Sequence, residues 1–295
     1  MNTRICAICG VSLASICLLP ALVFGQTKRS KSDADISAIG HRNIAQGPNF
    51  YTPEKEKELG NKLALETEKS SQFVVDPSIT AFVERVAQNV ERNSDKHMPI
   101  TIKLIDTEEA KAFTLPGGHQ YITRGLLLRL ESEGELASVI ARGIALTALR
   151  SNTKIATKAE ILQLSTIPIP SSGKGGAPNS GVPLAIPLLE LKARREAELD
   201  ADYFGVQYLY KSGYDAKCFL DFVARIGDAN KTVPETFSQY PPLPQRLQAL
   251  QKEIAEMLPK RDGAVISTKE FQEFKDHLQA MKPEGAVPQN PSKDN

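Results

Sequence analysis

E-L-A-S-V-I-A-R-G-I-A-L-T-A-L-R, residues 135–150, is a long apolar run that predicts a helix buried on most of its surface. Two residues in its centre are unusual for such a helix. Arg142 carries a charge that deprotonation cannot remove, and Gly143 lowers helix stability by about 1 kcal/mol relative to alanine. Leu146, one turn after Arg142, has no donor atom. None of these three side chains offers a lone pair to a metal ion.

The segments around this helix predict an α+β fold that is mostly helical. Asp76 and Pro77 form a helix start, and apolar residues then recur at helical spacing from Ile79 to Val90. Short alternating runs predict a small sheet of three to four strands beside the central helix. Helices are expected at 53–68, 77–90, 133–150, 188–210, 216–226, 244–257 and 268–281, and strands at 100–105, 112–115 and 120–123.

The chain of 295 residues predicts one folded domain that covers residues 51–281. Residues 26–50 are polar and show no periodic pattern, which predicts a flexible lead-in. Pro, Gly and Ser are frequent in residues 167–187, so we expect a lid loop there and neither a helix nor a strand. The polar composition of residues 282–295 predicts a disordered tail.

The first 25 residues carry one charge, Arg4, followed by an apolar run from Ile5 to Phe24. This pattern predicts a signal peptide that is cleaved near Gly25, and hence export to the periplasm or cell envelope. The alternative is an uncleaved membrane anchor, because the run is nearly long enough to span a bilayer. Contact with a membrane is expected only in that second case.

The charge balance and the cysteines limit the classes of partner and of crosslink. Lysine and arginine number 36 and aspartate and glutamate 35, without a basic cluster, so no nucleic acid partner is expected. Cys6, Cys9 and Cys17 lie in the apolar leader, and a cleaved chain keeps only Cys218. The exported chain is therefore expected to form no internal disulfide.

Several blocks of sequence, in the same order, resemble one family of enzymes. They are A-F-T-L-P-G-G-H-Q-Y-I-T-R-G-L-L at 112–127, the lead-in E-L-A-S-V-I-A, R-E-A-E-L-D-A-D-Y-F-G at 195–205 and P-P-L-P-Q-R at 241–246. The chain resembles gluzincin zinc metallopeptidases of the CAAX prenyl protease and HtpX type, in their secreted periplasmic branch. The resemblance implies a zincin fold, proteolysis in envelope quality control, and zinc as the cofactor.

In that family, zinc is bound by the two histidines of an H-E-x-x-H motif and by a glutamate of a later helix, where this chain has Glu198. The three motif positions hold Arg142, Gly143 and Leu146 here. Tyr240 replaces a further histidine of the secreted members. Only Glu198 is retained, so the sequence predicts no catalytic residues and no bound metal.

Other residues could rebuild a metal site only in an unusual form. His119 lies in a segment expected near the cleft, and a site made of His119, Glu198 and Asp202 is the weak alternative. The plainer interpretation of His119 is a hydrogen-bonded residue on a surface strand. Removal of the metal would leave Glu198 and Asp202 close together, so we predict that Arg142 forms an ion pair with one or both of them.

Binding of an extended peptide beside an edge strand requires no metal. The resemblance places that edge at 115–123, where Leu115, Pro116, Gly117, Gly118 and His119 would let two backbones approach closely. An ordinary turn is the alternative interpretation of Pro116 to Gly118.

The sequence thus predicts an exported pseudoprotease that binds polypeptide or regulates a partner protein, including a related active protease. An active zinc metalloendopeptidase with a non-standard metal site and a structural subunit are the two alternatives. The three differ in whether metal is bound, in whether a groove lies open beside residues 115–123, and in whether a large apolar patch is exposed.

Overall fold

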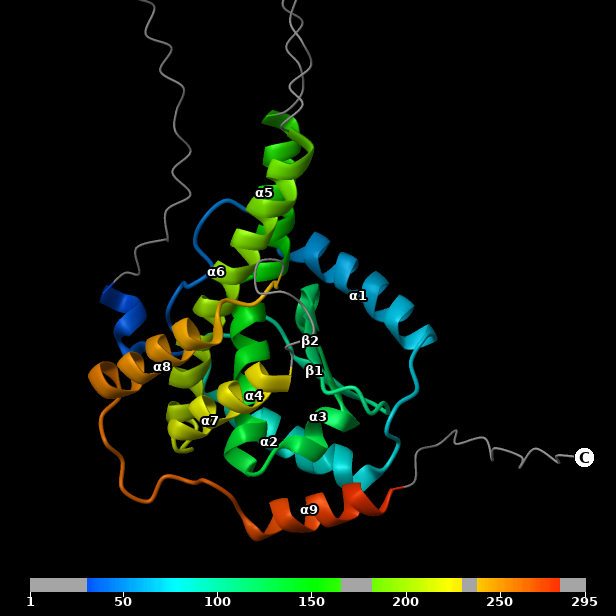
Figure 1. Cartoon of the computed structure of the whole chain (residues 1–295), viewed down its shortest axis with the longest axis vertical. Coiled ribbons are helices and arrows are strands. Elements are labelled where there is room, and N and C mark those ends of the chain that lie inside the picture. The colour runs from blue at the N-terminus through cyan, green and yellow to red at the C-terminus, as the bar shows by residue number, and fades with distance from the viewer. Residues whose placement is uncertain (1–30, 166–181, 230–237, 282–295) are drawn as a thin grey trace, which may run out of the picture.

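The computed structural model describes residues 31–165, 182–229 and 238–281 (Figure 1). The described part is α+β and mostly helical, with one three-stranded mixed sheet, as predicted. None of the helices within these ranges is both long and apolar enough to cross a lipid bilayer. The α-helices are α1 Pro53–Lys69, α2 Pro77–Arg92, α3 Arg124–Arg129, α4 Glu133–Ala148, α5 Ser151–Ser165, α6 Val182–Lys211, α7 Lys217–Ala229, α8 Leu243–Met257 and α9 Lys269–Ala280.

Local capping explains where several helices begin. Asp76 accepts hydrogen bonds from the backbone N–H groups of Ser78 and Ile79 at 2.9 and 3.1 Å, which starts α2 at Pro77. Ser132 caps α4 in the same way by accepting from Glu135 N at 3.1 Å. The buried face of α2 carries the apolar residues that the spacing predicted.

The sheet consists of β1 Thr101–Ile105, β2 Ala112–Leu115 and β3 His119–Thr123, in the order β1-β3-β2. The middle strand, β3, pairs with β1 in parallel and with β2 in antiparallel orientation. The short 3-10 helix η3, Pro116–Gly118, links β2 to β3. The prediction of an edge at 115–123 is wrong for residues 119–123, because β3 has a neighbour on each side. The outer strands are β1, which an isolated bridge joins to Phe73, and β2.

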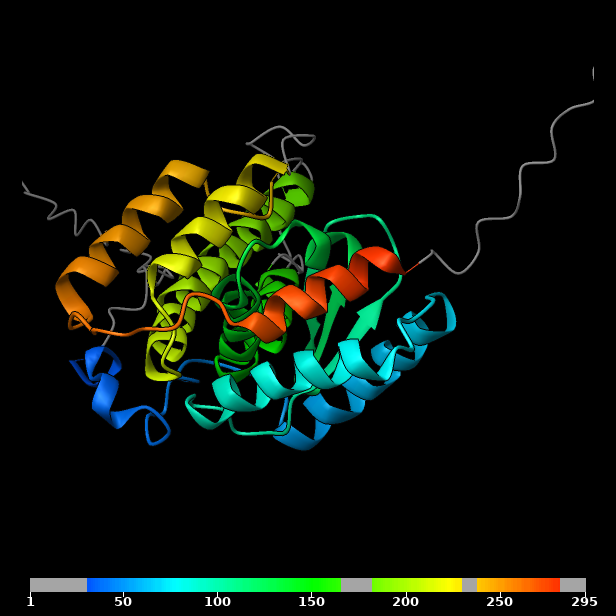
Figure 2. The same ribbon diagram turned by 90° about the horizontal axis from the view of Figure 1, so that it is seen from below.

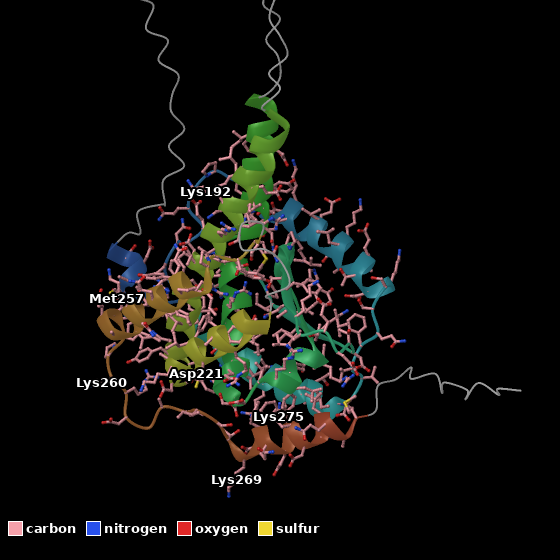
Figure 3. The ribbon with its side chains drawn as sticks, in the orientation of Figure 1. Lys192, Asp221, Met257, Lys260, Lys269 and Lys275 are labelled. Atoms are coloured by element: carbon pink, nitrogen blue, oxygen red, sulfur yellow. The ribbon has the colours of Figure 1, made fainter. Side chains whose placement is uncertain are left out.

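The core surrounds α4, which is buried along almost its whole length and packs chiefly against α6. Figure 2 shows α9 on the same side of the molecule as α2, where the Phe82 ring stacks on Phe274 at a centroid distance of 4.7 Å. Lys275 of α9 reaches from the position labelled in Figure 3 to the carbonyl oxygens of Leu127, Leu128 and Leu130, which end α3. Its ammonium group thus joins α9 to the rest of the core.

A flexible lead-in was predicted at 26–50, but residues 31–50 have a defined structure. They form two short 3-10 helices, η1 Lys31–Ala34 and η2 Ile36–Ala38, and Ile39 and Ile44 belong to the core. Arg42 is buried and bonds to Asp95 at the end of α2, with Nε 3.0 Å and Nη2 2.5 Å from Oδ2. This segment is polar in composition, but a long-range ion pair fixes its position.

A lid loop was predicted at 167–187, but residues 182–187 are helical, because α6 already begins at Val182. Pro183 lies in the first turn of α6, where a missing N–H removes no helical hydrogen bond. The remainder of the lid, the leader and the tail lie outside the described residues. Helices α3 and α5 were not predicted. Together with the start of α6, α5 forms the hairpin at the top of Figure 1.

Candidate functional site

Arg142 lies at the centre of α4 and faces α6, where Glu198 and Asp202 are one helical turn apart. Its Nη2 donates to Glu198 Oε2, and its Nε lies 3.8 Å from Asp202 Oδ1. The structure therefore brings together the three residues of the predicted ion pair. Both members of the Arg142–Glu198 pair are largely buried, with 11% and 15% of their side-chain surface exposed.

A second arginine, Arg246 of α8, neutralises Asp202. Its Nε donates to Oδ2 at 2.7 Å and its Nη2 to Oδ1 at 2.8 Å, which is the bidentate geometry of an arginine and a carboxylate. Burial lowers the pKa of Arg246, but the charge and the hydrogen bonds of Asp202, together with Tyr240, raise the pKa overall. The sequence did not reveal this pairing, because residues 202 and 246 lie on different helices. The local sequence around one residue gives no indication that it contacts the other.

Tyr240 completes the group between the two arginines. The guanidinium carbon of Arg142 lies 5.9 Å from the centroid of its ring, and that of Arg246 lies 6.0 Å away. Burial lowers the pKa of Arg142, and the positive charge of Arg246 acts in the same direction. The ion-pair cluster, as we call Arg142, Glu198, Asp202, Arg246 and Tyr240, thus contains two cations and two anions and is neutral.

The other two altered positions of α4 face apolar or packed surroundings. Leu146 is partly buried and packs on the main core. Gly143 faces β3, and a Cβ atom at this position would lie 2.3 Å from Nε2 of Gln120. Gln120 was not identified from the sequence, since nothing in the spacing of residues 120 and 143 indicates that they meet.

His119 is not part of the ion-pair cluster in the structure. Its Nε2 lies 3.0 Å from Asn61 Oδ1 on α1, and burial lowers its pKa. Among the described residues, no three His, Cys, Asp or Glu side chains are grouped so that they could hold a metal ion. The one carboxylate retained from the family pattern, Glu198, is bonded to a guanidinium. The residues present therefore do not fit a zinc ion.

The predicted peptide-binding turn at Pro116 to Gly118 is covered by α1. A Cβ atom at Gly60 of α1 would lie 2.0 Å from the carbonyl oxygen of Pro116, so the two backbones are in close contact. Gly117 allows close approach of Lys57 of α1, and Gly118 allows close approach of Pro99, so the backbone contacts of this turn lie within the chain itself. β2 is an outer strand of the sheet, and on its outer side Asn152 Nδ2 donates to the carbonyl oxygen of Thr114 at 2.8 Å.

A cavity of about 710 Å³ lies between α5, α6, α8 and the loop at residues 46–48. Met257, labelled in Figure 3 at the end of α8, is part of its wall. Of the ion-pair cluster, only Asp202 contributes to the lining. Burial lowers the pKa of Lys154 in this wall to about 8, and the charge of Asp200 opposes this shift only in part.

The relatives of this chain are proteases. The model of peptidase family M48 matches residues 75–254. The chain is 23% identical over 221 residues to a beta-barrel assembly-enhancing protease of Yersinia pestis, with 70% of this chain and 45% of the relative covered. It is 29% identical over 231 residues to a putative beta-barrel assembly-enhancing protease of Vibrio cholerae, with coverages of 68% and 47%.

A beta-barrel assembly-enhancing protease of Escherichia coli K12 is 22% identical over 255 residues, with 82% of this chain and 52% of the relative covered. The chain thus spans about half the length of the curated relatives that it matches. The family match covers more than half of the chain and includes both α4 and the helix that carries Glu198. The resemblance inferred from the sequence blocks is confirmed, and the chain belongs to peptidase family M48.

Proposed function

We propose that this chain is a non-catalytic member of its family, a pseudoprotease that binds polypeptide or regulates a partner protein in the cell envelope. The observation that carries the proposal is the ion pair between Arg142 and Glu198. A guanidinium group occupies the centre of α4, where the family pattern has a histidine, and it uses the carboxylate that the pattern assigns to the metal.

The charges of the ion-pair cluster argue against a metal ion at this place. The two carboxylates are already neutralised by Arg142 and Arg246, with Asp202 bonded through both of its oxygens. A dication would have to displace Arg142 from Glu198 and would then lie beside two guanidinium groups. Neither Gly143 nor Leu146 supplies a donor atom or a base that could activate water.

The edge of β2 supports the binding half of the proposal. Lys111 O accepts from Thr123 N at 3.0 Å, so backbone groups of alternate residues point toward β3. Residues 112 and 114 therefore direct their backbone N–H and C=O groups away from β3, toward the free edge. An extended polypeptide can pair with such an edge, provided that it replaces or accommodates the hydrogen bond from Asn152 to Thr114.

The kind of partner follows from the leader and the relatives. The apolar leader supports export to the periplasm or envelope, and the relatives are named for enhancing the assembly of beta-barrel proteins. We infer that the partner is an envelope polypeptide or a related active protease. The balanced charge gives no reason to expect a nucleic acid partner.

The test is binding of a fluorescently labelled unfolded casein to the purified full chain, with zinc present throughout. Anisotropy reports binding and gel electrophoresis reports cleavage. We expect saturable binding without fragments. Thr114→Pro removes one outward N–H of the edge strand, where proline is tolerated, and should weaken binding.

Asn152→Ala is the matched control, because it frees the Thr114 carbonyl and should leave binding equal or stronger. Cleavage of casein that depends on Glu198 would overturn the non-catalytic assignment. Absence of binding, or equal binding by Thr114→Pro, would overturn the edge as the binding surface.

A further inference from the structure

The space that a side chain at position 143 of α4 would need is filled by Gln120 of β3. An ideal Cβ atom at Gly143 would lie 2.3 Å from Cδ and Nε2 of Gln120, and 2.6 Å from its Oε1. Real Cβ atoms essentially never approach a heavy atom closer than 3.0 Å. Any side chain at position 143 therefore requires Gln120 to move.

Gln120 is held in place from several sides. It lies in β3, where its backbone is paired with Ile102 of β1 and Thr114 of β2. Its side chain is 2% exposed, and its Nε2 donates to the carbonyl oxygen of Val139, one turn before Gly143, at 3.1 Å. The β3 backbone cannot shift without breaking the sheet on both sides.

The side chain of Gln120 is flexible at its end, so the question is whether it can leave the position. Departure would break the bond to Val139, and the carboxamide would have to enter the surrounding core. Within the described part of the chain, its Oε1 is already buried without a hydrogen-bond partner. A second unsatisfied group would be added to the first, which makes displacement unfavourable.

We infer that Gln120 is a second residue, besides Arg142, that prevents a return to the family motif. Its side chain fills the space beside position 143, so that only glycine fits there. This effect is independent of Arg142. In the family pattern, position 143 is where the water-activating carboxylate would project. Return of the motif residues to α4 alone would therefore not rebuild the site. The inference deepens the proposed non-catalytic role. It rests on that proposal, because position 143 is of functional interest only if it corresponds to the catalytic glutamate of the family.

A thermal unfolding cycle on the full chain tests the packing. Alanine is the better helix former, so Gly143→Ala would raise the melting temperature if Gln120 yielded freely. We expect it instead to lower the melting temperature by about 3 °C or more, and Gln120→Ala in the same chain to restore most of that loss. Unchanged or raised stability of Gly143→Ala, or no restoration, would overturn the inference.

Gly134→Ala is the matched control on the same helix. A Cβ atom there would lie 2.5 Å from Sγ of Cys218, so this variant is also strained, but for a different reason. Gln120→Ala should not restore its stability. Restoration of both glycine variants would mean that Gln120→Ala stabilises the fold generally, and the specific pairing would be refuted.

Zinc content separates this inference from the proposed function. The variant Arg142→His, Gly143→Glu, Leu146→His is compared with the same variant carrying Gln120→Ala, by elemental analysis after zinc loading. We expect more zinc per chain when Gln120 is shortened, and equal occupancy would contradict the inference. Zinc bound by the unaltered chain would refute the non-catalytic role but not the packing cycle. If the motif variant does not fold, the alanine cycle decides alone.

Discussion

Two buried groups of charges in this molecule differ in how completely they are hydrogen-bonded. Around Asp95, the carboxylate accepts from Gly40 N at 2.7 Å and from Tyr208 Oη at 2.9 Å, in addition to Arg42. Arg42 Nη1 donates to Gln207 Oε1 at 2.7 Å. In the ion-pair cluster, by contrast, Nε of Arg142 is buried and has no hydrogen-bond partner among the described residues.

The difference indicates that the two groups of charges are matched to their surroundings to different degrees. The Asp95 network, which is Gly40, Arg42, Asp95, Gln207 and Tyr208, joins the N-terminal segment to α2 and α6 with both charged side chains at most 1% exposed. It behaves as a structural crosslink whose geometry suits its residues. In the ion-pair cluster, Arg142 is hydrogen-bonded only in part. Stability should therefore depend more on the first group than on the second.

The largest effect is expected for Asp95→Ala. This change leaves the buried guanidinium of Arg42 without its carboxylate and also strands Gly40 N and Tyr208 Oη. We expect a loss of about 4 to 5 kcal/mol in the free energy of unfolding, measured by urea denaturation. Glu91→Gln, in the more exposed pair with Lys96, serves as control and should change stability by less than about 1 kcal/mol. Equal losses for the two variants would contradict the structural role of the network.

Asp202→Ala should have the next largest effect. It removes both hydrogen bonds of Arg246, whose side chain is 7% exposed, and leaves two arginines near a single carboxylate. We expect a loss of about 3 kcal/mol by the same measurement. A loss below that of Glu198→Gln would mean that the Asp202–Arg246 pair contributes less to stability than the Arg142–Glu198 pair.

Glu198→Gln tests the weaker half of the cluster. The amide oxygen can still accept from Arg142, but the charge is lost, so we expect a decrease of about 1 to 2 kcal/mol in unfolding free energy. The cluster would then have more cations than anions. If this variant were as unstable as Asp95→Ala, the contrast between the two groups would be wrong.

Lys154 provides an effect that depends on pH. Its pKa falls to about 8 in the folded chain, mainly through burial, from an ordinary value of 10.5. Below pH 8 the charged amine therefore opposes folding. As the pH rises from 8 to 10.5, the folded chain releases this proton before the unfolded chain does, and stability rises.

Lys154→Met should remove this contribution. The variant should be more stable than the unaltered chain at pH 7, and the difference between the two should shrink as the pH approaches 10. Urea denaturation at a series of pH values measures it. A difference that is independent of pH would show that Lys154 does not titrate in this range.

Local patterns predicted most of the elements. Asp76 and Pro77 located the start of α2, and alternation located all three strands, because these features depend on neighbouring residues. The order of the strands could not be predicted in the same way. It depends on contacts between distant segments, such as the contact of α1 with the turn at Pro116 to Gly118, and β3, part of the expected edge, proved to be the middle strand.

A contact in the site could be predicted only where the position in the family pattern and the charges of the side chains indicated the same pairing. Arg142 and Glu198 could be paired because an unneutralised carboxylate and a new cation were expected at the same place. Arg246 and Gln120 could not be assigned, since each acts through a contact between distant segments. The segment that contains Arg42 was predicted to be flexible for the same reason, because it looks polar until Asp95 is placed beside it.

The measurement that tests the central claim most directly is the zinc content of the purified full chain by elemental analysis, after equilibration with excess zinc and removal of the unbound ion. Glu198→Ala and the surface variant Glu256→Ala are measured in parallel. We predict no stoichiometric zinc in any of the three chains, because Arg142 neutralises the one retained ligand. One zinc per chain that is lost in Glu198→Ala and kept in Glu256→Ala would show that a metal site exists and would contradict the account.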